Sequence, residues 1–487
     1  MEFIQACGLT ICPKTILQSH ETLAKVLMKK AAEVAQGPHM LAFDNVQVSM
    51  SKHFTQRPGA IPMVSSFTTI ILYSLKRALL EACRLGPILE RRKIAPMITY
   101  EEHILPSQTE MVSISVHIAR DIIKILMENT KGFTLADYAE LLKHETHRPP
   151  QDNDKITYEY VLRTAEIDES TTVGCLEVLR HSYKDQLELL DEIFKDLGIP
   201  CINDQLTNAR VRRGQIERQG DKTAFCRLQC FQIGIGLFHL AMNLAWHILY
   251  THKGSEDTPG SLAFYAKYLN IRRVIKERPD YYTLRSFLYH VLFANILYAW
   301  SIKTGQSDLT KFAETTPGHC DLLTTALEIL ADFASDKGLG QCEETETLRR
   351  NTILLNRDLL YYFELECAIS SGDFGRIEQL LGILASMFNG AGGKNYCNEI
   401  LHLIQNLKSS WPENFALVNS YYLLLLITDE LLQSNVMRDN MLISMNGRDN
   451  HFTGVDLNIE HNINYQKVRN LLSISFFLFI DYYYIVL

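Results

Sequence analysis

Residues 40–49, MLAFDNVQVS, form a short apolar run that contains an Asp-Asn pair, and residues 199–207, IPCINDQLT, repeat this pattern. In both places a helical stretch comes first, a glycine ends it, and the apolar run follows. Alternation of helices with apolar strands is typical of an α/β unit with a mostly buried sheet. Ligands bind at the carboxyl ends of strands in such sheets. The pattern therefore predicts that Asp44 and Asp204 lie at strand ends where chemistry usually occurs.

Most of the other segments have helical periodicity. Apolar residues at steps of three and four predict one helix from Leu176 to Leu197, with Thr171 or Thr172 as its cap. Residues 114–126 predict a second amphipathic helix. From about residue 224 to residue 432 the pattern is almost wholly helical, and we find no convincing strand there. The predicted layout is an α/β region followed by a long helical block.

Composition excludes some classes of protein. The 487 residues are 47% hydrophobic and 21% charged, as in a folded globular protein. The net charge of -8 excludes a wholly basic nucleic-acid binder but not a local basic groove. Motifs of serine hydrolases, zinc proteases and dinucleotide-binding enzymes are missing from the sequence, so no small-molecule cofactor is indicated.

Compartment and membrane contact follow from the termini and the cysteines. The N-terminus has no basic region followed by an apolar run, and the eleven cysteines are scattered, so we expect a nuclear or cytoplasmic protein. Residues 471–487 are very apolar, but they are too few for a membrane span, and Asp481 interrupts them. A buried terminal strand or an error in the gene model explains this tail better than a membrane anchor.

The acids offer one chemical hypothesis. Two strand aspartates and one later acid would make a site for Mg²⁺, which prefers oxygen ligands and can assist phosphodiester cleavage. Asp44 and Asp204 are the candidate strand acids, and the third acid is either Glu460 in DLNIEHN or Glu364 in YYFELECAI. Aspartates also cap helices and form turns, so spacing alone leaves both interpretations open.

A basic segment follows Asp204 directly. It suits a flexible loop that holds a phosphate backbone near bound metal ions, and nearby acids leave a simple solvated loop as the alternative. The candidate nucleic-acid ligands are Arg210, Arg212, Arg213, Arg218 and Lys222.

Six segments taken in order carry a family resemblance. They are QGPHMLAFDNVQVS (36–49), AEIDESTTVGCLEVL (165–179), INDQLT (202–207), GLFHLAM (236–242), LLYYFELECAISSGDFGRIE (359–378) and HFTGVDLNIEHNINYQKV (451–468). The ordered set resembles an uncharacterised, mainly fungal family catalogued as domain of unknown function 6589, over roughly Gly8 to Lys467. The family in turn looks like transposon-derived proteins related to transposases with an RNase H-like core. This chain has Asn203 where the family usually has a glycine, so the turn after the strand is expected to differ.

The resemblance implies a fold and a site. The expected fold is an RNase H-like α/β core with a mixed sheet and flanking helices, interrupted by a large all-α insertion, and helix-dominated overall. The expected segments are an N-terminal helical segment (1–36), the first part of the core (37–223), the helical insertion (224–440), a core return segment (441–470) and the apolar tail (471–487). Matching motifs carry over Asp44, Asp204, His239, Asp456, Glu460 and His461.

Two functions follow from these observations. The first is a transposase-related protein that cleaves or joins DNA with Mg²⁺ held by Asp44, Asp204 and Glu460, or an inactive derivative of one. The alternative is a non-catalytic helical scaffold that binds nucleic acid or protein. DNA is the expected partner in the first case and nucleic acid or protein in the second; a membrane is expected in neither, and the sequence leaves the oligomeric state open.

Overall fold

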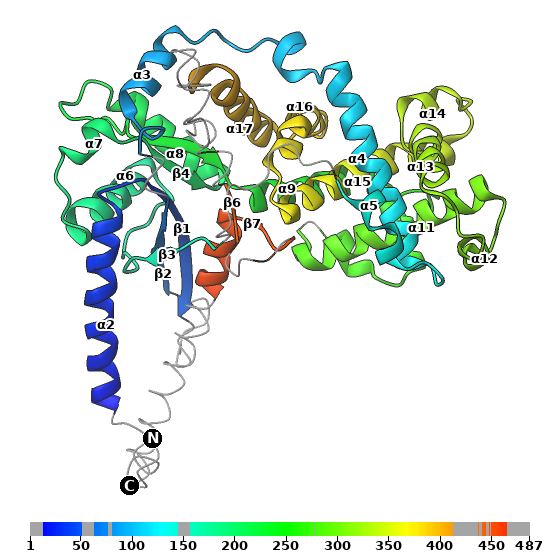
Figure 1. Cartoon of the computed structure of the whole chain (residues 1–487). Helices are drawn as coiled ribbons and strands as arrows, with labels where there is room; N and C mark the ends of the chain where they lie inside the picture. Colours follow the sequence, from blue (N-terminus) through cyan, green and yellow to red (C-terminus); the bar gives the residue numbers. More distant parts are fainter. Residues whose placement is uncertain are drawn as a thin grey trace, which may run out of the picture.

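The structure of the protein is a computed structural model (Figure 1). It describes residues 13–50, 63–75, 80–144, 156–276, 278–412, 437, 441–444, 448 and 450–464. The apolar tail (471–487) lies outside these residues. In the described part, helices predominate and surround one mixed sheet, which confirms the predicted class of a helix-dominated α/β protein with a mixed sheet.

The described strands of this sheet stand in the order β3-β2-β1-β4-β5. β1 pairs antiparallel with β2, and β2 pairs antiparallel with β3, whereas β4 runs parallel to both β1 and β5. The strand bounds are β1 (His39–Met50), β2 (Met63–Ser74), β3 (Glu159–Val161), β4 (Ile199–Asn203) and β5 (Phe231–Ile235). β4 and β5 are buried at every residue because helices cover both faces of the parallel part.

The sequence predicted β1 and β4 but did not reveal the other three strands. The expectation that residues 224–432 hold no strand is wrong, because Phe231–Ile235 forms β5 at the edge of the sheet. A buried run of five residues cannot be distinguished from part of a buried helix by periodicity alone.

Several helices pack around the sheet (Figure 1). The helix predicted from Leu176 to Leu197 is broken: α6 (Thr172–Arg180) passes into a π-helical turn, and α7 (Ile193–Asp196) is separate. Glu188, between them, has a left-handed φ of 53°, which no helix interior adopts. Thr171 caps α6, as predicted. The others are α2 (Pro13–Val34), α3 (Leu85–Ile94), α8 (Gln205–Glu217) and α17 (Lys394–Gln405).

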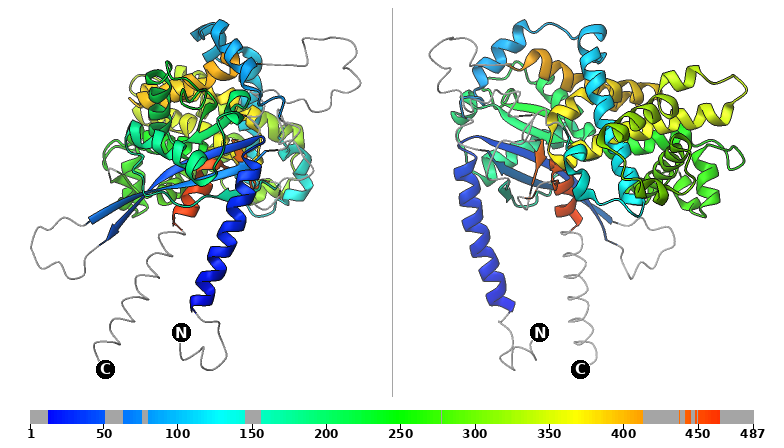
Figure 2. Two further views of the ribbon diagram at one scale, coloured as in Figure 1. Left: turned by 90° about the vertical axis from the view of Figure 1, so that its left-hand side faces the viewer. Right: turned by 45° about the vertical axis from the view of Figure 1, so that its right-hand side comes forward.

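A helical block adjoins the sheet on the side away from α6 and α7 (Figures 1 and 2). Its longer helices are α4 (Gln108–Asn129), α9 (Leu237–His252), α11 (Tyr281–Thr304), α13 (His319–Phe333), α15 (Thr347–Ser371) and α16 (Phe374–Gly390). Its shorter ones are α5 (Ala139–Leu142), α10 (Leu262–Tyr268), α12 (Leu309–Glu314) and α14 (Asp336–Gly340). α4 confirms the second predicted amphipathic helix.

In the chain, α4 and α5 of the block lie between β2 and β3, and two further connections join the block to the sheet after β5. α9 begins directly after β5 and packs against α11 and α15 in the block. The chain returns through the short pair β6 (Leu442–Ile443) and β7 (Thr453–Gly454), and then through helical residues 455–464. Asn458 in this last helix donates to the hydroxyl of Tyr73 on β2 at 3.0 Å, so the returning helix lies beside the sheet. Among the described helices, none has an apolar stretch long enough to cross a membrane.

Candidate active site: a carboxylate cluster beside the sheet

Asp44 lies in the middle of β1, so the prediction that it ends a strand is wrong. β1 continues past it because β1 pairs with β2 along its whole length, with Asp44 opposite Thr69. Leu41, three residues before Asp44, pairs with Cys201, three residues before Asp204. In this register Asp204, the first residue after β4, is level with Asp44 in the middle of β1.

The turn after β4 fixes Asp204 next to β1. Asn203 Oδ1 accepts a hydrogen bond from the backbone N–H of Phe43 at 3.0 Å, which ties the end of β4 to β1. Asp204 is the N-cap of α8, and its Oδ1 accepts from the N–H of Thr207 at 2.7 Å. The sequence left open whether Asp204 caps a helix, and the structure shows that one of its oxygens does.

His239 lies at the start of α9 and is held by two acids from the returning helix. Asp456 accepts from the backbone N–H groups of Phe238 (3.0 Å) and His239 (2.7 Å), and also lies 3.0 Å from His239 Nδ1. The other ring nitrogen, Nε2, lies 3.6 Å from Oε1 of Glu460. Ligand atoms of Asp44, His239 and Glu460 all lie within 4.8 Å of one another.

Gly236 allows this close approach of Asp456 to α9. A Cβ built at Gly236 would lie 2.4 Å from Oδ2 of Asp456, closer than real Cβ contacts occur. A larger residue at this position would push Asp456 away from the start of α9. The glycine in GLFHLAM is thus part of the site's geometry.

Burial and mutual repulsion set the protonation of this cluster. Burial, together with the charges of Asp204 and Glu460, raises the pKa of Asp44 from 3.8 to about 7, against the opposing effect of His239. Burial alone would lower the pKa of His239, but the hydrogen bond and charge of Asp456 and the charge of Asp44 raise it to about 9. At neutral pH His239 is therefore an imidazolium among carboxylates.

Glu169 is a further acid of the cluster that the sequence did not reveal. It is 2% exposed, and its Oε1 accepts from the hydroxyl of Thr207 at 3.3 Å. Burial, then the charges of Asp44 and Asp204, raise its pKa well above the usual value. Glu169 sits in the loop before α6 among other acids, in AEIDES, and only the fold distinguishes it from them.

Tyr396 on α17 also faces the cluster. Its hydroxyl accepts a hydrogen bond from Asn243 Nδ2 at 2.9 Å. Burial, and then the negative charges of Asp204, Asp456 and Asp44, raise the pKa of the Tyr396 hydroxyl. A neutral phenol therefore borders the carboxylates, and no motif in the sequence indicated it.

The two candidate third acids lie in different places. Glu460 is in the cluster, whereas Glu364 is buried in the helical block and accepts from Nε (2.9 Å) and Nη2 (2.6 Å) of Arg376. His461, the neighbour of Glu460, is exposed and is outside the group of possible metal ligands in the described residues.

The basic segment is mainly a helix, so the prediction of a flexible loop is wrong. Asp204 caps α8, which runs to Glu217 and contains the first three arginines. Arg210 donates to the Glu169 carbonyl, Arg212 pairs with Glu399, and Arg213 pairs with Glu217. The last two members, Arg218 and Lys222, follow α8, and Arg218 lies 4.0 Å from Asp221.

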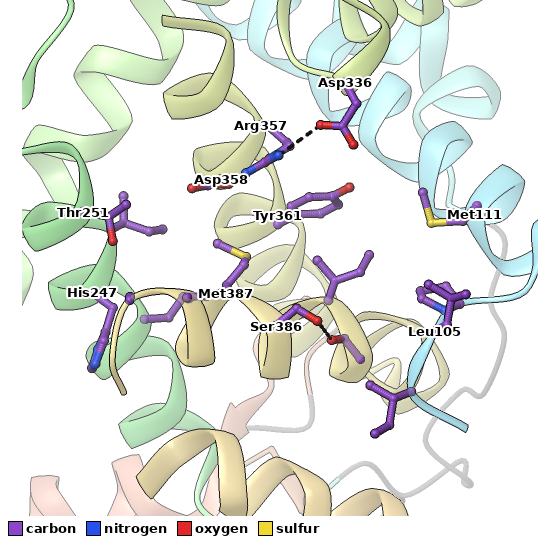
Figure 3. Close-up of a pocket in the computed structure, with 18 of the residues that line it drawn as sticks. Leu105, Met111, His247, Thr251, Asp336, Arg357, Asp358, Tyr361, Ser386 and Met387 are labelled. Atoms are coloured by element: carbon purple, nitrogen blue, oxygen red, sulfur yellow. Dashed lines mark hydrogen bonds and ion pairs between the residues drawn. The ribbon is translucent and has the colours of Figure 1, made fainter. Parts of the chain in front are cut away.

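A cavity of about 500 Å³ opens elsewhere, between α9, α15, α16 and the segment before α4 (Figure 3). Its lining is mostly apolar, with Met111 and Met387 on opposite sides. Its charged residues are paired, because Arg357 lies beside both Asp336 and Asp358. None of the residues predicted for the site lines this cavity.

Comparison with known proteins gives one match. The model of a family described as "Family of unknown function (DUF6589)" matches residues 93–470. The matched range includes Glu169, Asp204, His239 and Glu460 but begins after Asp44, so it is shorter at its start than the range expected from the sequence. Comparisons with curated proteins and with solved structures gave no match.

Proposed function

Because the chain belongs to this family of unknown function, we propose a function from the site itself: metal-dependent cleavage or strand transfer of DNA by an RNase H-like core. The main support is the placement of Asp44 on β1 and of Asp204 directly after the neighbouring parallel strand β4, with Glu460 reaching Asp44 from the returning helix. This is the arrangement of acids that the resemblance to transposases implies. Apart from α4 and α5, which precede Asp204, the helical block lies between Asp204 and Glu460 in sequence, as an insertion would.

Asp44 and Glu460 offer oxygen ligands for a hard divalent cation such as Mg²⁺; His239 is the third member of their group, and Asp204 lies outside it. Oε2 of Glu169 is buried and finds no hydrogen-bond partner among the described residues. A buried oxygen without a donor is costly, and a bound cation would satisfy it. Asp44, Asp204 and Glu460 would hold Mg²⁺, which when bound stabilises charge on a phosphate and makes water a better nucleophile.

The other residues of the cluster would control protons and orientation. Asp456 accepts from Nδ1 of His239 and so fixes the ring with Nε2 directed toward Glu460. With a pKa of about 9, His239 holds a proton at neutral pH beside the place where a phosphate oxygen would bind. A protonated imidazole in that position can donate to a phosphate or to a leaving oxygen.

A test of this proposal is cleavage of supercoiled plasmid by the purified full chain with Mg²⁺ or Mn²⁺. Asp44→Asn and Glu460→Gln should each lower the nicking rate at least about 100-fold, since even outer partners of metal ligands cost up to that much. Glu192→Gln is the matched control, because Glu192 is 70% exposed and outside the cluster. Equal nicking by all four proteins would reveal a contaminant and defeat the proposal.

The scaffold alternative has support from one contact. His239 already places a positive charge between Asp456 and Glu460, so the cluster is partly neutralised without a metal. If the wild type binds DNA but shows no metal-dependent nicking, and Asp44→Asn with Glu460→Gln leaves the affinity unchanged, the scaffold is the correct function.

A further inference from the structure

A second group of buried polar side chains lies in the helical block, where α4, α15 and α16 pack together (Figure 1). Asp121 of α4 is fully buried, Glu364 of α15 is 1% exposed, and His144 follows α5 at the edge of the block. Ligand atoms of these three residues lie within 4.8 Å of one another. They come from separate parts of the chain, so their convergence is a product of the fold.

Positive charge balances this group only in part. Arg376 donates two hydrogen bonds to Glu364, at 2.9 and 2.6 Å, and its charge also acts on Asp121. Lys124 attracts Asp121 from the surface, where its side chain is 41% exposed, and Arg120, whose Nε and Nη1 are buried, acts on His144. Both oxygens of Asp121 are buried and accept no conventional hydrogen bond from the described residues, so a metal ion or a proton shared with Glu364 would complete their coordination.

The arrangement of the two histidines favours a metal ion at this place. His144 Nε2 lies 3.4 Å from Oδ1 of Asp121, and its Nδ1 lies 3.0 Å from Nδ1 of His117, whose ring stacks on it. If Nδ1 of His144 donates in that contact, Nε2 carries a lone pair directed at the Asp121 carboxylate. An imidazole nitrogen 3.4 Å from a buried carboxylate oxygen, with the Glu364 carboxylate in the same group, is a metal-ligand arrangement.

We propose that Asp121, His144 and Glu364 bind one transition-metal ion of the zinc class, which ties the segment after α5 to α4 and α15. A mixed nitrogen and oxygen set suits Zn²⁺, whereas Mg²⁺ prefers oxygen ligands alone. Zinc bonds of about 2.0–2.2 Å place ligand atoms roughly 3–4 Å apart, so small side-chain movements complete the site. A water molecule takes the fourth position. This inference does not depend on the proposed function of the sheet cluster.

The test measures zinc retained by the full chain. Protein is stripped with a chelator, incubated with ZnCl₂, desalted and analysed for metal by mass spectrometry, and Co²⁺ absorption in the visible range reports the ligand geometry. The wild type should retain about one zinc ion per chain, as a site of this kind holds. Asp121→Asn and His144→Ala should lose it. The double variant Asp44→Asn/Glu460→Gln should keep it, and so should His181→Ala, which removes a half-buried histidine outside both groups.

Folding is checked by circular dichroism for each variant. His144 lies at the edge of the cluster with its side chain 19% exposed, so His144→Ala gives a folded protein even if Asp121→Asn does not. Absence of retained zinc in the wild type would overturn the proposal and leave a proton shared between Asp121 and Glu364 as the explanation. Zinc lost from Asp44→Asn/Glu460→Gln but kept in His144→Ala would overturn it too, because the metal would then belong to the sheet cluster.

Discussion

Two buried carboxylate sites in this protein differ in the supply of hydrogen-bond donors. In the helical block, Glu366 accepts from the hydroxyls of Tyr281 and Tyr362, each at 2.6 Å, and also from Tyr289 and Arg285. Each oxygen of Glu366 thus has two donors. In the sheet cluster, two carboxylates share His239, and the buried Oε2 of Glu169 has no hydrogen-bond partner among the described residues.

The comparison shows that burial of an acid alone does not identify a functional site. A buried carboxylate with enough donors is a structural element, because its charge is balanced within the protein. A buried group of carboxylates with too few donors is destabilising unless something else binds. The excess of acceptors over donors is therefore the better sign of a binding site, and opposite effects of mutation are expected at the two places.

The largest effect is expected at Glu366. Glu366→Ala leaves three tyrosine hydroxyls and Arg285 without their acceptor, and should lower the free energy of unfolding by about 3–5 kcal/mol. Urea denaturation followed by circular dichroism measures this. Glu328→Ala is the control, because Glu328 is 56% exposed and its pair with Lys303 contributes less than about 1 kcal/mol. Equal losses in both variants would remove the distinction between the two sites.

Asp44→Asn should raise the free energy of unfolding, opposite to the effect of Glu366→Ala. The native pKa of about 7 exceeds the ordinary 3.8, so the folded state binds the proton more tightly, and stability falls as pH rises between these values. The asparagine variant has no carboxylate to ionise at this position, so its stability does not fall in this way. It should be more stable than wild type at pH 8, by roughly 1–3 kcal/mol. Melting temperatures at pH 5 and pH 8 test this. A variant less stable than wild type at pH 8 would show that the carboxylate is satisfied.

Asp456→Asn should lower the free energy of unfolding by about 1–2 kcal/mol, less than Glu366→Ala does, because it weakens the cap of α9 and the contact with His239. Without the Asp456 charge, burial dominates and the pKa of His239 should fall from about 9. Because the pKa of His239 is raised, protonation of His239 stabilises the folded wild type fully below pH 6.5, and this stabilisation disappears as the pH rises through 9. The stability of the variant should change less over the same pH range. NMR titration of the imidazole, assigned with His239→Gln, measures the shift. An unchanged pKa would mean that other acids control His239.

The smallest effect on stability is expected at Arg213. Its side chain is 71% exposed and pairs with Glu217, so Arg213→Ala should change stability by less than about 0.5 kcal/mol. If it contacts phosphate, the slope of log affinity for duplex DNA against log salt should fall by about 0.9. Arg180→Ala, which removes an arginine 55% exposed on α6, is the control. Equal slopes in wild type and Arg213→Ala would exclude this contact.

The arginines also show where sequence reasoning fails. Arg212 and Arg213 are adjacent in the chain, yet Arg212 is mostly buried against Glu399 of α17 and only Arg213 is well exposed. Spacing cannot reveal this difference, because it depends on a helix almost two hundred residues away. A double substitution would therefore confuse DNA binding with the loss of a structural ion pair.

β1 and β4 were predictable because each is a continuous apolar run after a glycine. β3 has only three residues, and β2 begins with a serine- and threonine-rich stretch, so local pattern gives little for either. Asp44, Asp204 and Glu460 could be chosen because motifs mark them. Glu169 and Tyr396 could not, since their contribution comes from being brought next to Asp44 and Asp204 by packing.

The cap of α9 has a consequence for the order of events on the ribosome. Asp456 accepts from the backbone of His239, 217 residues earlier in the chain. At a synthesis rate of about 5–20 residues per second, roughly 10–40 s pass between translation of His239 and arrival of its partner. During that interval β4, β5 and the whole helical block can fold while the imidazole is still without its carboxylates. The site is therefore assembled last, and any product shortened before Asp456 lacks both the cap of α9 and Glu460.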